Sequence, residues 1–341
     1  MDQIPENVRY RQLGPDLVMC RILNGMWQVS GGHGPIDPVA AVERMLAHHR
    51  AGLSTWDLAD HYGPAEDFVG AFRSRLAAEQ GAEALSQVQA FTKWVPRPEP
   101  MTRQIVEPAI ARSLRRMGVD TLDLLQFHWW DYDDARYRDA LRQLDQLREE
   151  GIIRHLALTN FDTAHTEIII ESGIPIVSNQ VQYSLVDLRP ERKMVQFCLA
   201  HDVQLLTYGT LCGGLLSERY LGQPEPRWAE LDTASLQKYK QMIDAWGGWA
   251  LFQRLLVVLQ GIADKHHATI ANVAVRAILD RPAVAGVIVG VRLGLSDHLA
   301  DTLRVFDLHL DADDRSQIDA VLAQSRDLLA IIGDCGDEYR R

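Results

Sequence analysis

The stretch STWDLADHYGPAED, residues 54–67, contains one complete strand-to-helix transition. Its first half, STWDLAD, is a short apolar run that ends in carboxylates, and a helical pattern begins at Ala65 and continues to about Ala78. A strand that is followed by its own helix is the repeating unit of α/β proteins, and the rest of the chain repeats this unit.

Apolar runs alternate with amphipathic segments from one end of the chain to the other. The predicted strands are residues 22–27, 54–60, 88–93, 120–129, 154–160, 177–182, 203–209 and 286–291. The predicted helices are residues 38–50, 65–78, 102–117, 134–150, 163–172, 190–201 and 269–280. Strands that are joined by helices lie parallel, and strands covered on both faces read as nearly continuous apolar runs. Eight such units in 341 residues predict a closed (β/α)8 TIM barrel.

Three segments lie outside these repeats. Residues 8–21 predict a short N-terminal β-hairpin around Gly14-Pro15. Residues 217–250 form a long polar loop after the seventh strand, and residues 309–341 form a C-terminal tail with a helix at about 312–325. We expect the loop and the tail to cover the mouth of the barrel. No segment rich in Pro, Gly or Ser divides the chain, so residues 1–341 are predicted to form a single domain.

The composition narrows the classes of partner. The formal net charge of −11 argues against a nucleic-acid surface. The four cysteines contain no CxxC pair, so we expect reduced thiols, a cytoplasmic location and no metal site. The N-terminus lacks the pattern of a secretory signal, and no apolar run approaches the ~20 residues of a membrane span. The composition does not decide between a monomer and a homo-oligomer.

Polar residues close several predicted strands, and active sites of (β/α)8 barrels lie at those carboxyl ends. The second strand is followed by Asp57 and then Tyr62, the third ends at Lys93, and the fourth ends at His128. Each has a structural alternative: the carboxylate can cap its loop, the phenol can pack on a helix, the lysine can be solvated, and the histidine can be satisfied in the core. Charged groups are rarely buried without partners, so the set as a whole favours a site.

These four side chains also form a chemically coherent set. An ammonium beside a phenol stabilises the phenolate and lowers the pKa of Tyr62. Asp57 can keep the Lys93 ammonium charged and in place, and His128 can donate to, or polarise, an oxygen beside the phenol. A phenol tuned in this way is a general acid for an alkoxide and, in reverse, a base for an alcohol.

In this order on successive strands, the four residues resemble the catalytic tetrad of the aldo-keto reductase superfamily. The resemblance covers almost the whole chain through the segments NGMWQVSGG, WDLADHYGPAED, TKW, LLQFHWWD, LALTNF, SNQVQYSL, LLTYGTLCGGLLS and VIVGVR, followed by HLADTL. It implies an oxidoreductase that moves hydride between a nicotinamide dinucleotide and a carbonyl or alcohol group. Tyr62 would donate the proton, Lys93 with Asp57 would tune it, and His128 would orient the substrate oxygen.

The resemblance also implies a set of cofactor residues. Thr159, Asn160 and Gln180 would hold the carboxamide, and Tyr208 would stack on the nicotinamide ring. The other matched positions are Met26 and Trp27 near the nicotinamide, Gly209, Thr210, Leu211, Gly213 and Leu215 along the diphosphate, and Gly290, Arg292, His298, Asp301 and Thr302 at the adenosine end.

The region after the last strand bears on the choice of cofactor. Family members that prefer NADP carry two cationic residues around the adenosine 2′-phosphate, and this chain keeps Arg292 but has His298 at the second position. Asp301 and Thr302 stand where the family has a Glu-Asn pair. An arginine pairs with a phosphate as a charged fork, so NADP(H) is expected first and NAD(H) is the alternative. The turn SGGHGP, residues 30–35, lacks the G-x-G-x-x-G spacing and is interpreted as a loop at the barrel mouth.

Aromatic residues after the strand ends predict the walls of a substrate pocket. Trp27 and Trp129 match family positions that line the substrate site, and Trp94 follows the third strand. Aromatic walls suit apolar or ring-bearing carbonyl compounds and also sugar faces, so aldehydes, ketones and sugar-like alcohols stay open. The histidine pairs at 48–49 and 266–267 are interpreted as surface residues.

Two other functions stay open on the sequence. The chain can be a cofactor-binding regulatory subunit that resembles the β subunits of potassium channels, which bind the dinucleotide and dock on a partner. It can also be a barrel isomerase or lyase that uses no dinucleotide. The complete tetrad and the lack of an obvious docking segment argue against the regulatory subunit.

Overall fold

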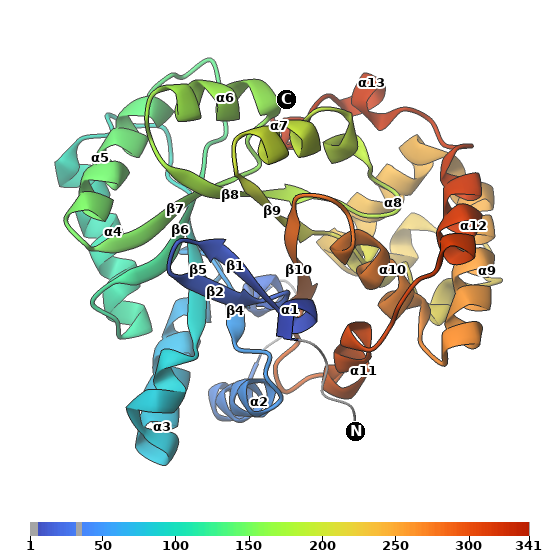
Figure 1. Ribbon diagram of the computed structural model, residues 1–341, viewed down its shortest axis with the longest axis horizontal. Coiled ribbons are helices and arrows are strands. Elements are labelled where there is room, and N and C mark those ends of the chain that lie inside the picture. Colours follow the sequence, from blue (N-terminus) through green and yellow to red (C-terminus); the bar gives the residue numbers. More distant parts are fainter. Residues whose placement is uncertain (1–5, 32–35, 341) are drawn as a thin grey trace.

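The predicted strands close into a parallel barrel in the computed structural model, which describes residues 6–31 and 36–340. The barrel strands are β3 (Ile22–Gly25), β4 (Thr55–Asp57), β5 (Gln89–Trp94), β6 (Leu122–His128), β7 (Ile153–Thr159), β8 (Ile176–Gln182), β9 (Gln204–Tyr208) and β10 (Val284–Gly290). Their order is β10-β3-β4-β5-β6-β7-β8-β9, and β10 pairs with β3 to close the ring (Figure 1). The predicted (β/α)8 TIM barrel is therefore confirmed.

Helices surround the barrel on its outer side (Figure 1). The crossover helices that the sequence predicts are α2 (Pro38–Arg50), α3 (Ala65–Ser86), α4 (Arg103–Met117), α5 (Tyr137–Glu149), α6 (Thr163–Glu171), α7 (Met194–Ala200) and α10 (Ile270–Leu279). Side chains of Asp37, Asp162 and Thr269 accept hydrogen bonds from the first backbone N–H groups of α2, α6 and α10, which fixes where these helices begin. Helix α3 runs past the predicted end near Ala78 because Gly81, at φ 81°, kinks the helix without ending it.

The predicted N-terminal hairpin is present and closes one end of the barrel. Strands β1 (Tyr10–Gly14) and β2 (Leu17–Cys20) are antiparallel and follow the short helix α1 (Glu6–Arg9). Leu17 and Met19 of the hairpin share a buried cluster with Leu23 and Ala285, which lie near the starts of β3 and β10. The hairpin therefore covers the amino-terminal end of the barrel, and the carboxyl ends of the strands are left for the site (Figure 1).

The segment after β9 differs from the polar loop that the sequence predicts. It contains α8 (Ala234–Trp246) and the start of α9 (Gly248–His266). One face of α8 is buried and carries Leu236, Tyr239, Met242, Ile243 and Trp246. The other face is rich in Gln and Lys, and this polar face is why the sequence reads as a loop.

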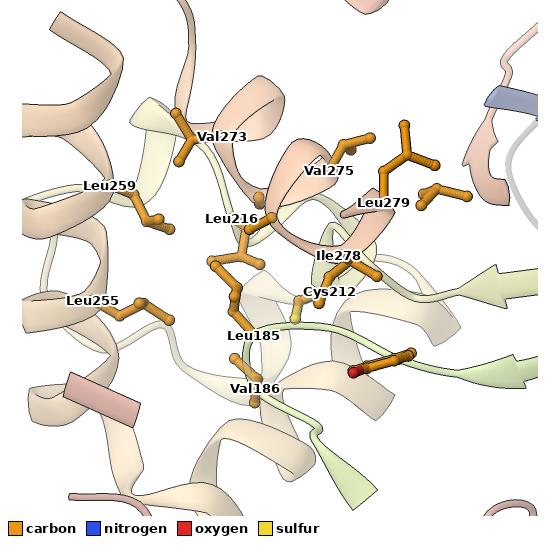
Figure 2. Packing of buried hydrophobic residues seen from close by; sticks show 14 of the residues in the cluster. Leu185, Val186, Cys212, Leu216, Leu255, Leu259, Val273, Val275, Ile278 and Leu279 are labelled. Atoms are coloured by element: carbon orange, nitrogen blue, oxygen red, sulfur yellow. The ribbon is translucent and has the colours of Figure 1, made fainter. Parts of the chain in front are cut away.

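Helices α9 and α10 pack on the segments that follow β8 and β9 (Figure 2). The contacts shown there join Leu255 and Leu259 of α9 to Val273 and Ile278 of α10 and to Leu216. This packing joins the chain just after β9 to α9 and α10 beside the barrel. No single described helix is long and apolar enough to cross a bilayer, and α8 with α9 meets the length and composition criterion only as a pair bent by 98°.

The C-terminal tail contains the predicted helix and returns to the barrel mouth. Helix α11 (Leu299–Leu303) is followed by α12 (Ala312–Leu322), α13 (Leu328–Ile332) and a short 3-10 turn at Asp337–Tyr339. The Arg189 guanidinium anchors the end of the tail through the Asp334 carbonyl at 3.0 Å and the Glu338 carboxylate at 3.0 Å. That residues 1–341 form a single domain stays a prediction.

Candidate active site

The predicted tetrad residues lie at one end of the barrel. Asp57 is the last residue of β4, Lys93 is the penultimate residue of β5, and His128 is the last residue of β6. The register pairs His128 with Thr159 and Thr159 with Gln180, so the polar ends of β6, β7 and β8 stand side by side. Parallel neighbours in a closed barrel place these side chains around a single mouth.

A buried ion pair forms the base of the site. The Lys93 ammonium lies 2.7 Å and 2.8 Å from the two carboxylate oxygens of Asp57 and 2.9 Å from the Leu58 carbonyl oxygen. Asp57 also accepts hydrogen bonds from the side-chain amides of Gln126 (3.0 Å) and Gln180 (2.6 Å). Burial lowers the pKa of Lys93, and the Asp57 carboxylate opposes that shift.

The Tyr62 ring covers this ion pair. The Lys93 ammonium lies 5.3 Å from the ring centroid, and the Trp27 ring packs against Tyr62 at a centroid distance of 5.1 Å. Burial raises the pKa of Tyr62 well above its usual value, and the Asp57 charge adds to that shift. The predicted lowering of this pKa is therefore wrong for the protein alone, because burial and the Asp57 charge together outweigh the Lys93 ammonium.

His128 has a defined donor and acceptor. Its Nδ1 lies 3.0 Å from the Thr159 carbonyl oxygen, which accepts only, so Nδ1 carries the hydrogen and Nε2 is the acceptor in the neutral ring. Burial lowers the pKa of His128 to about 4 and keeps the ring neutral. Nε2 is buried and has no hydrogen-bond partner among the described residues.

The residues matched to the carboxamide differ in how they are engaged. The Thr159 hydroxyl is buried and has no partner in the described part of the chain. Asn160, at φ 58°, accepts a hydrogen bond from the Tyr208 hydroxyl at 2.8 Å. The Gln180 amide nitrogen donates to Asp57 and, at 2.7 Å, to Gln126. Of these three residues, Thr159 alone has a fully buried side-chain polar atom that finds no hydrogen-bond partner among the described residues.

Helix α8 lies directly on the loop that was matched to the diphosphate. This loop has positive φ at Gly209 (73°), Gly213 (67°) and Gly214 (102°). A Cβ at Gly209 would overlap the Tyr239 ring of α8, and a Cβ at Gly213 would lie 3.0 Å from the backbone of Ser235. Glycine is needed here both for the backbone conformation and for the close approach of the helix. In the same loop, the Leu215 side chain and the Thr210 hydroxyl are buried, and Leu211 is only partly buried.

The residues matched to the adenosine end do not all gather. Gly290, Arg292, His298 and Thr302 line one small pocket together with the ion pair of Arg44 and Asp297. Asp301 points elsewhere: its carboxylate accepts from the Thr269 hydroxyl at 3.2 Å and the Asn272 amide at 3.3 Å.

The predicted aromatic walls need correction. Trp27 is 41% exposed, whereas Trp94 is 5% exposed and Trp129 is fully buried in the cluster between barrel and helices. Side chains alternate along a strand, and Lys93 and His128 face the barrel interior, so the residues that follow them face the helices. Trp130, by contrast, is 42% exposed, and its ring packs on the His128 ring at a centroid distance of 4.3 Å.

The remaining predictions concern Met26, the histidine pair at 48–49 and the turn at 30–35. Met26 is fully buried, so its side chain offers no surface to a ligand. His48 and His49 are buried as well, at 8% exposure each, because they lie on the inner face of α2; their interpretation as surface residues is wrong. In the turn at 30–35, residues 32–35 lie outside the described residues.

Sequence reasoning missed the groups that α8 and the tail bring to the mouth. The Lys238 ammonium of α8 lies 5.3 Å from the Tyr208 ring centroid and donates to the hydroxyl of Tyr339. The Arg340 guanidinium stacks 3.9 Å from the Tyr132 ring centroid and donates to the Trp129 carbonyl at 3.0 Å. No local pattern marks these residues, because their contacts depend on how the tail folds back.

The chain is similar to several known proteins. The sequence model of the aldo/keto reductase family matches residues 21–323. A flagellar radial spoke protein 5 of Chlamydomonas reinhardtii is 28% identical over 257 residues, which are 65% of this chain and only 49% of that protein. An NADH-specific methylglyoxal reductase of Escherichia coli K12 is 24% identical over 294 residues, which are 81% of this chain and 86% of that one. A solved glycerol dehydrogenase of Gluconobacter oxydans has the same fold, with a TM-score of 0.75 and 23% identity over 93% of this chain and 96% of that chain.

Proposed function

The chain belongs to the aldo/keto reductase family, and from this premise we propose that it transfers hydride between a nicotinamide dinucleotide and the carbonyl or alcohol carbon of an aldehyde, ketone or sugar-like substrate. Family membership makes it an oxidoreductase, and the residue roles and the substrate belong to the proposal. The observation that carries it is the buried contact of Lys93 with Asp57 beneath the Tyr62 ring, with His128 at the end of the neighbouring strand β6, where its Nε2 has no partner among the described residues.

Tyr62 is the proton donor in this proposal. Its raised pKa keeps the phenol protonated at neutral pH, so the hydroxyl can donate to a carbonyl oxygen. A nicotinamide dinucleotide held at the mouth would supply the hydride for reduction of the carbonyl carbon, or would accept it in the reverse direction. As the proton leaves, the Lys93 ammonium stabilises the phenolate, and Asp57 keeps that ammonium in position.

In this proposal His128 positions the substrate oxygen by accepting a hydrogen bond at Nε2. Because its Nδ1–H is used by the Thr159 carbonyl, the neutral ring presents a lone pair at Nε2. This lone pair accepts a hydrogen bond from the hydroxyl of an alcohol. In carbonyl reduction, Tyr62 is then the donor that protonates the substrate oxygen.

The residues at the mouth fit a nicotinamide dinucleotide. The buried Thr159 hydroxyl, which has no partner in the described chain, suits a carboxamide, and Gly214, which has open space around it, lets the backbone approach phosphate oxygens. We place NADP(H) first because Arg292 and His298 line one pocket, and NAD(H) second. The name of the Escherichia coli relative, an NADH-specific reductase, supports keeping NAD(H). Four buried, unpaired cysteines suit the reducing cytoplasm.

Purified protein with each reduced cofactor and a panel of aldehydes, and with each oxidised cofactor and a panel of alcohols, tests the proposal. We expect turnover with at least one substrate and a loss of about 100-fold or more in kcat for Tyr62→Phe. A Tyr62→Phe variant as fast as the wild type would remove Tyr62 from the mechanism.

Cofactor binding, followed by quenching of tryptophan emission, separates the alternatives. Binding of NADPH or NADH together with no turnover and a co-purifying partner would favour a regulatory subunit like the potassium-channel β subunits. Absence of binding by both cofactors would favour an isomerase or lyase.

A further inference from the structure

The mouth of the barrel contains a lysine, Lys238, whose ammonium forms no ion pair with any described residue. The Lys238 ammonium has the Tyr339 hydroxyl as its one hydrogen-bond acceptor among residues 6–31 and 36–340, and none of their carboxylate oxygens lies within 4.0 Å of it. The side chain is only partly exposed. A lysine ammonium has three N–H donors, so two of them are left without an acceptor from the described chain.

Aromatic rings hold this ammonium in place. It lies 5.3 Å, 5.5 Å and 4.4 Å from the ring centroids of Tyr208, Tyr239 and Tyr339. Aromatic faces attract a cation but do not neutralise it. The other lysine of the same helix is paired: the Lys240 ammonium lies 2.6 Å from carboxylate oxygens of both Glu225 and Asp244.

The cation is one aromatic ring away from the reaction site. The Tyr339 ring, which contacts Lys238, also lies edge-on to His128 and to Trp130, each at a centroid distance of 6.1 Å. The tail carboxylate of Glu338 is close enough to interact with the Lys238 charge, but its direct contact is with Arg189, at 3.0 Å. A partly buried ammonium, one aromatic ring from His128, therefore has N–H donors that no described residue accepts from, and these can bind an added anion.

We propose that Lys238 is a specificity residue that binds an oxyanion of the substrate, a carboxylate or a phosphate carried a few bonds from the reacting carbonyl or alcohol carbon. The inference rests on the proposed function, which places that carbon beside Tyr62 and His128. The ammonium donates to the oxyanion, and the Tyr339 hydroxyl keeps the ammonium directed into the mouth. The negative overall charge of −11 makes this local cation a selective feature rather than part of a general positive field.

Binding of unreactive probes tests the site without turnover. Benzoate and phenyl phosphate serve as the anionic probes and benzamide as the neutral one, titrated calorimetrically into the full chain. Whichever anionic probe binds the wild type, we expect Lys238→Met to weaken its affinity by about 10-fold to 100-fold. The affinity for benzamide should be unchanged. Lys238→Arg should restore most of the affinity. Lys193→Met removes the same charge from an exposed position and should leave all three affinities unchanged.

Activity and cofactor binding identify the source of the anion. We expect Lys238→Met to lower kcat/KM for 4-carboxybenzaldehyde but not for its methyl ester, and to leave the Kd of NADPH unchanged. Equal affinity of wild type and Lys238→Met for both anionic probes would overturn the proposal. So would a weaker Kd for NADPH with unchanged probe affinity, because the anion would then be the cofactor diphosphate. Probe binding that depends on Lys238, together with no turnover of any carbonyl or alcohol, would refute the proposed function and leave the oxyanion site standing.

Discussion

The Lys93 ammonium contacts both carboxylate oxygens of Asp57, at 2.7 Å and 2.8 Å, and both side chains are almost completely buried. Two further amides, from Gln126 and Gln180, complete the hydrogen bonding of the carboxylate. A charge pair that is buried and fully hydrogen-bonded contributes mainly when it is intact, because removing one member leaves the other charge without compensation.

We therefore expect Asp57→Asn and Lys93→Met each to lower the free energy of unfolding by about 3–5 kcal/mol. The double variant should lose clearly less than the sum of the two, because it leaves no lone buried charge. Urea unfolding of the four proteins measures this. All three variants should lose about 100-fold or more in kcat, since each removes the cation or its support from Tyr62. Additive losses of stability would contradict the interpretation.

The sequence predicted the positions of these residues but not their electrostatic balance. Asp57, Lys93 and His128 were found because each is a polar residue at the end of an apolar strand, and barrel topology brings strand ends together. The direction of the Tyr62 pKa was wrong because burial and the Asp57 charge, which the sequence does not reveal, outweigh the ammonium.

The sequence did not predict the contacts between segments that lie far apart along the chain. Tyr339 meets Lys238 across 101 residues of sequence, and that contact depends on the helix α8, whose Gln- and Lys-rich outer face disguised it as a loop. Trp94 and Trp129 are buried for a simpler reason, because side chains alternate along a strand and these two follow residues that face the barrel interior.

The raised pKa of Tyr62 predicts that its phenol does not ionise near neutrality in the free protein. Absorbance at 295 nm, compared between wild type and Tyr62→Phe, should show no difference below pH 10, since a group stays protonated below its pKa. Carbonyl reduction should accordingly not lose its proton donor between pH 6 and 9. A tyrosinate signal specific to the wild type below pH 9 would restore the lowered pKa that the sequence suggested.

Burial of His48 should lower the free energy of unfolding in mild acid. Its ring is buried in α2, its Nδ1 lies 2.6 Å from the Asn24 amide oxygen, and burial lowers its pKa from 6.5 to about 4. Between these values the unfolded chain binds a proton that the folded histidine does not, so stability falls as the pH decreases from 6.5 toward 4. The destabilisation caused by His48→Gln should therefore shrink by about 2 kcal/mol between pH 7.5 and 5. Denaturant unfolding at both pH values measures the change, and an equal effect at both would contradict it.

We expect the close approach of Gly336 to Asn160 to hold the C-terminal tail on the barrel mouth. It has φ 87°, and a Cβ there would overlap the Asn160 carbonyl oxygen. We expect Gly336→Ala to release residues 334–340, which hydrogen exchange and limited proteolysis would detect. Gly173 is the matched control, because it has the same φ of 87° and open space around a Cβ. Gly173→Ala should cost only the backbone strain of about 1–2 kcal/mol and leave the tail protected. Equal protection of the tail in both variants would show that Gly336 does not hold it.

Two adjacent tryptophans should separate substrate contact from core packing. Trp129 is fully buried and its Nε1 donates to the Asp131 carbonyl at 2.7 Å, whereas Trp130 is 42% exposed and contacts His128. Trp129→Ala should lower the free energy of unfolding by about 3–5 kcal/mol, because it empties a large volume in the core. Trp130→Ala should change stability little and raise KM for ring-bearing substrates, because the exposed ring is available for stacking at the mouth. Thermal unfolding and steady-state kinetics on the two variants measure these effects. If Trp130→Ala proved to be the unstable variant and Trp129→Ala the one with the altered KM, the residue after His128 would face the barrel, and the inward direction inferred for His128 would be wrong with it.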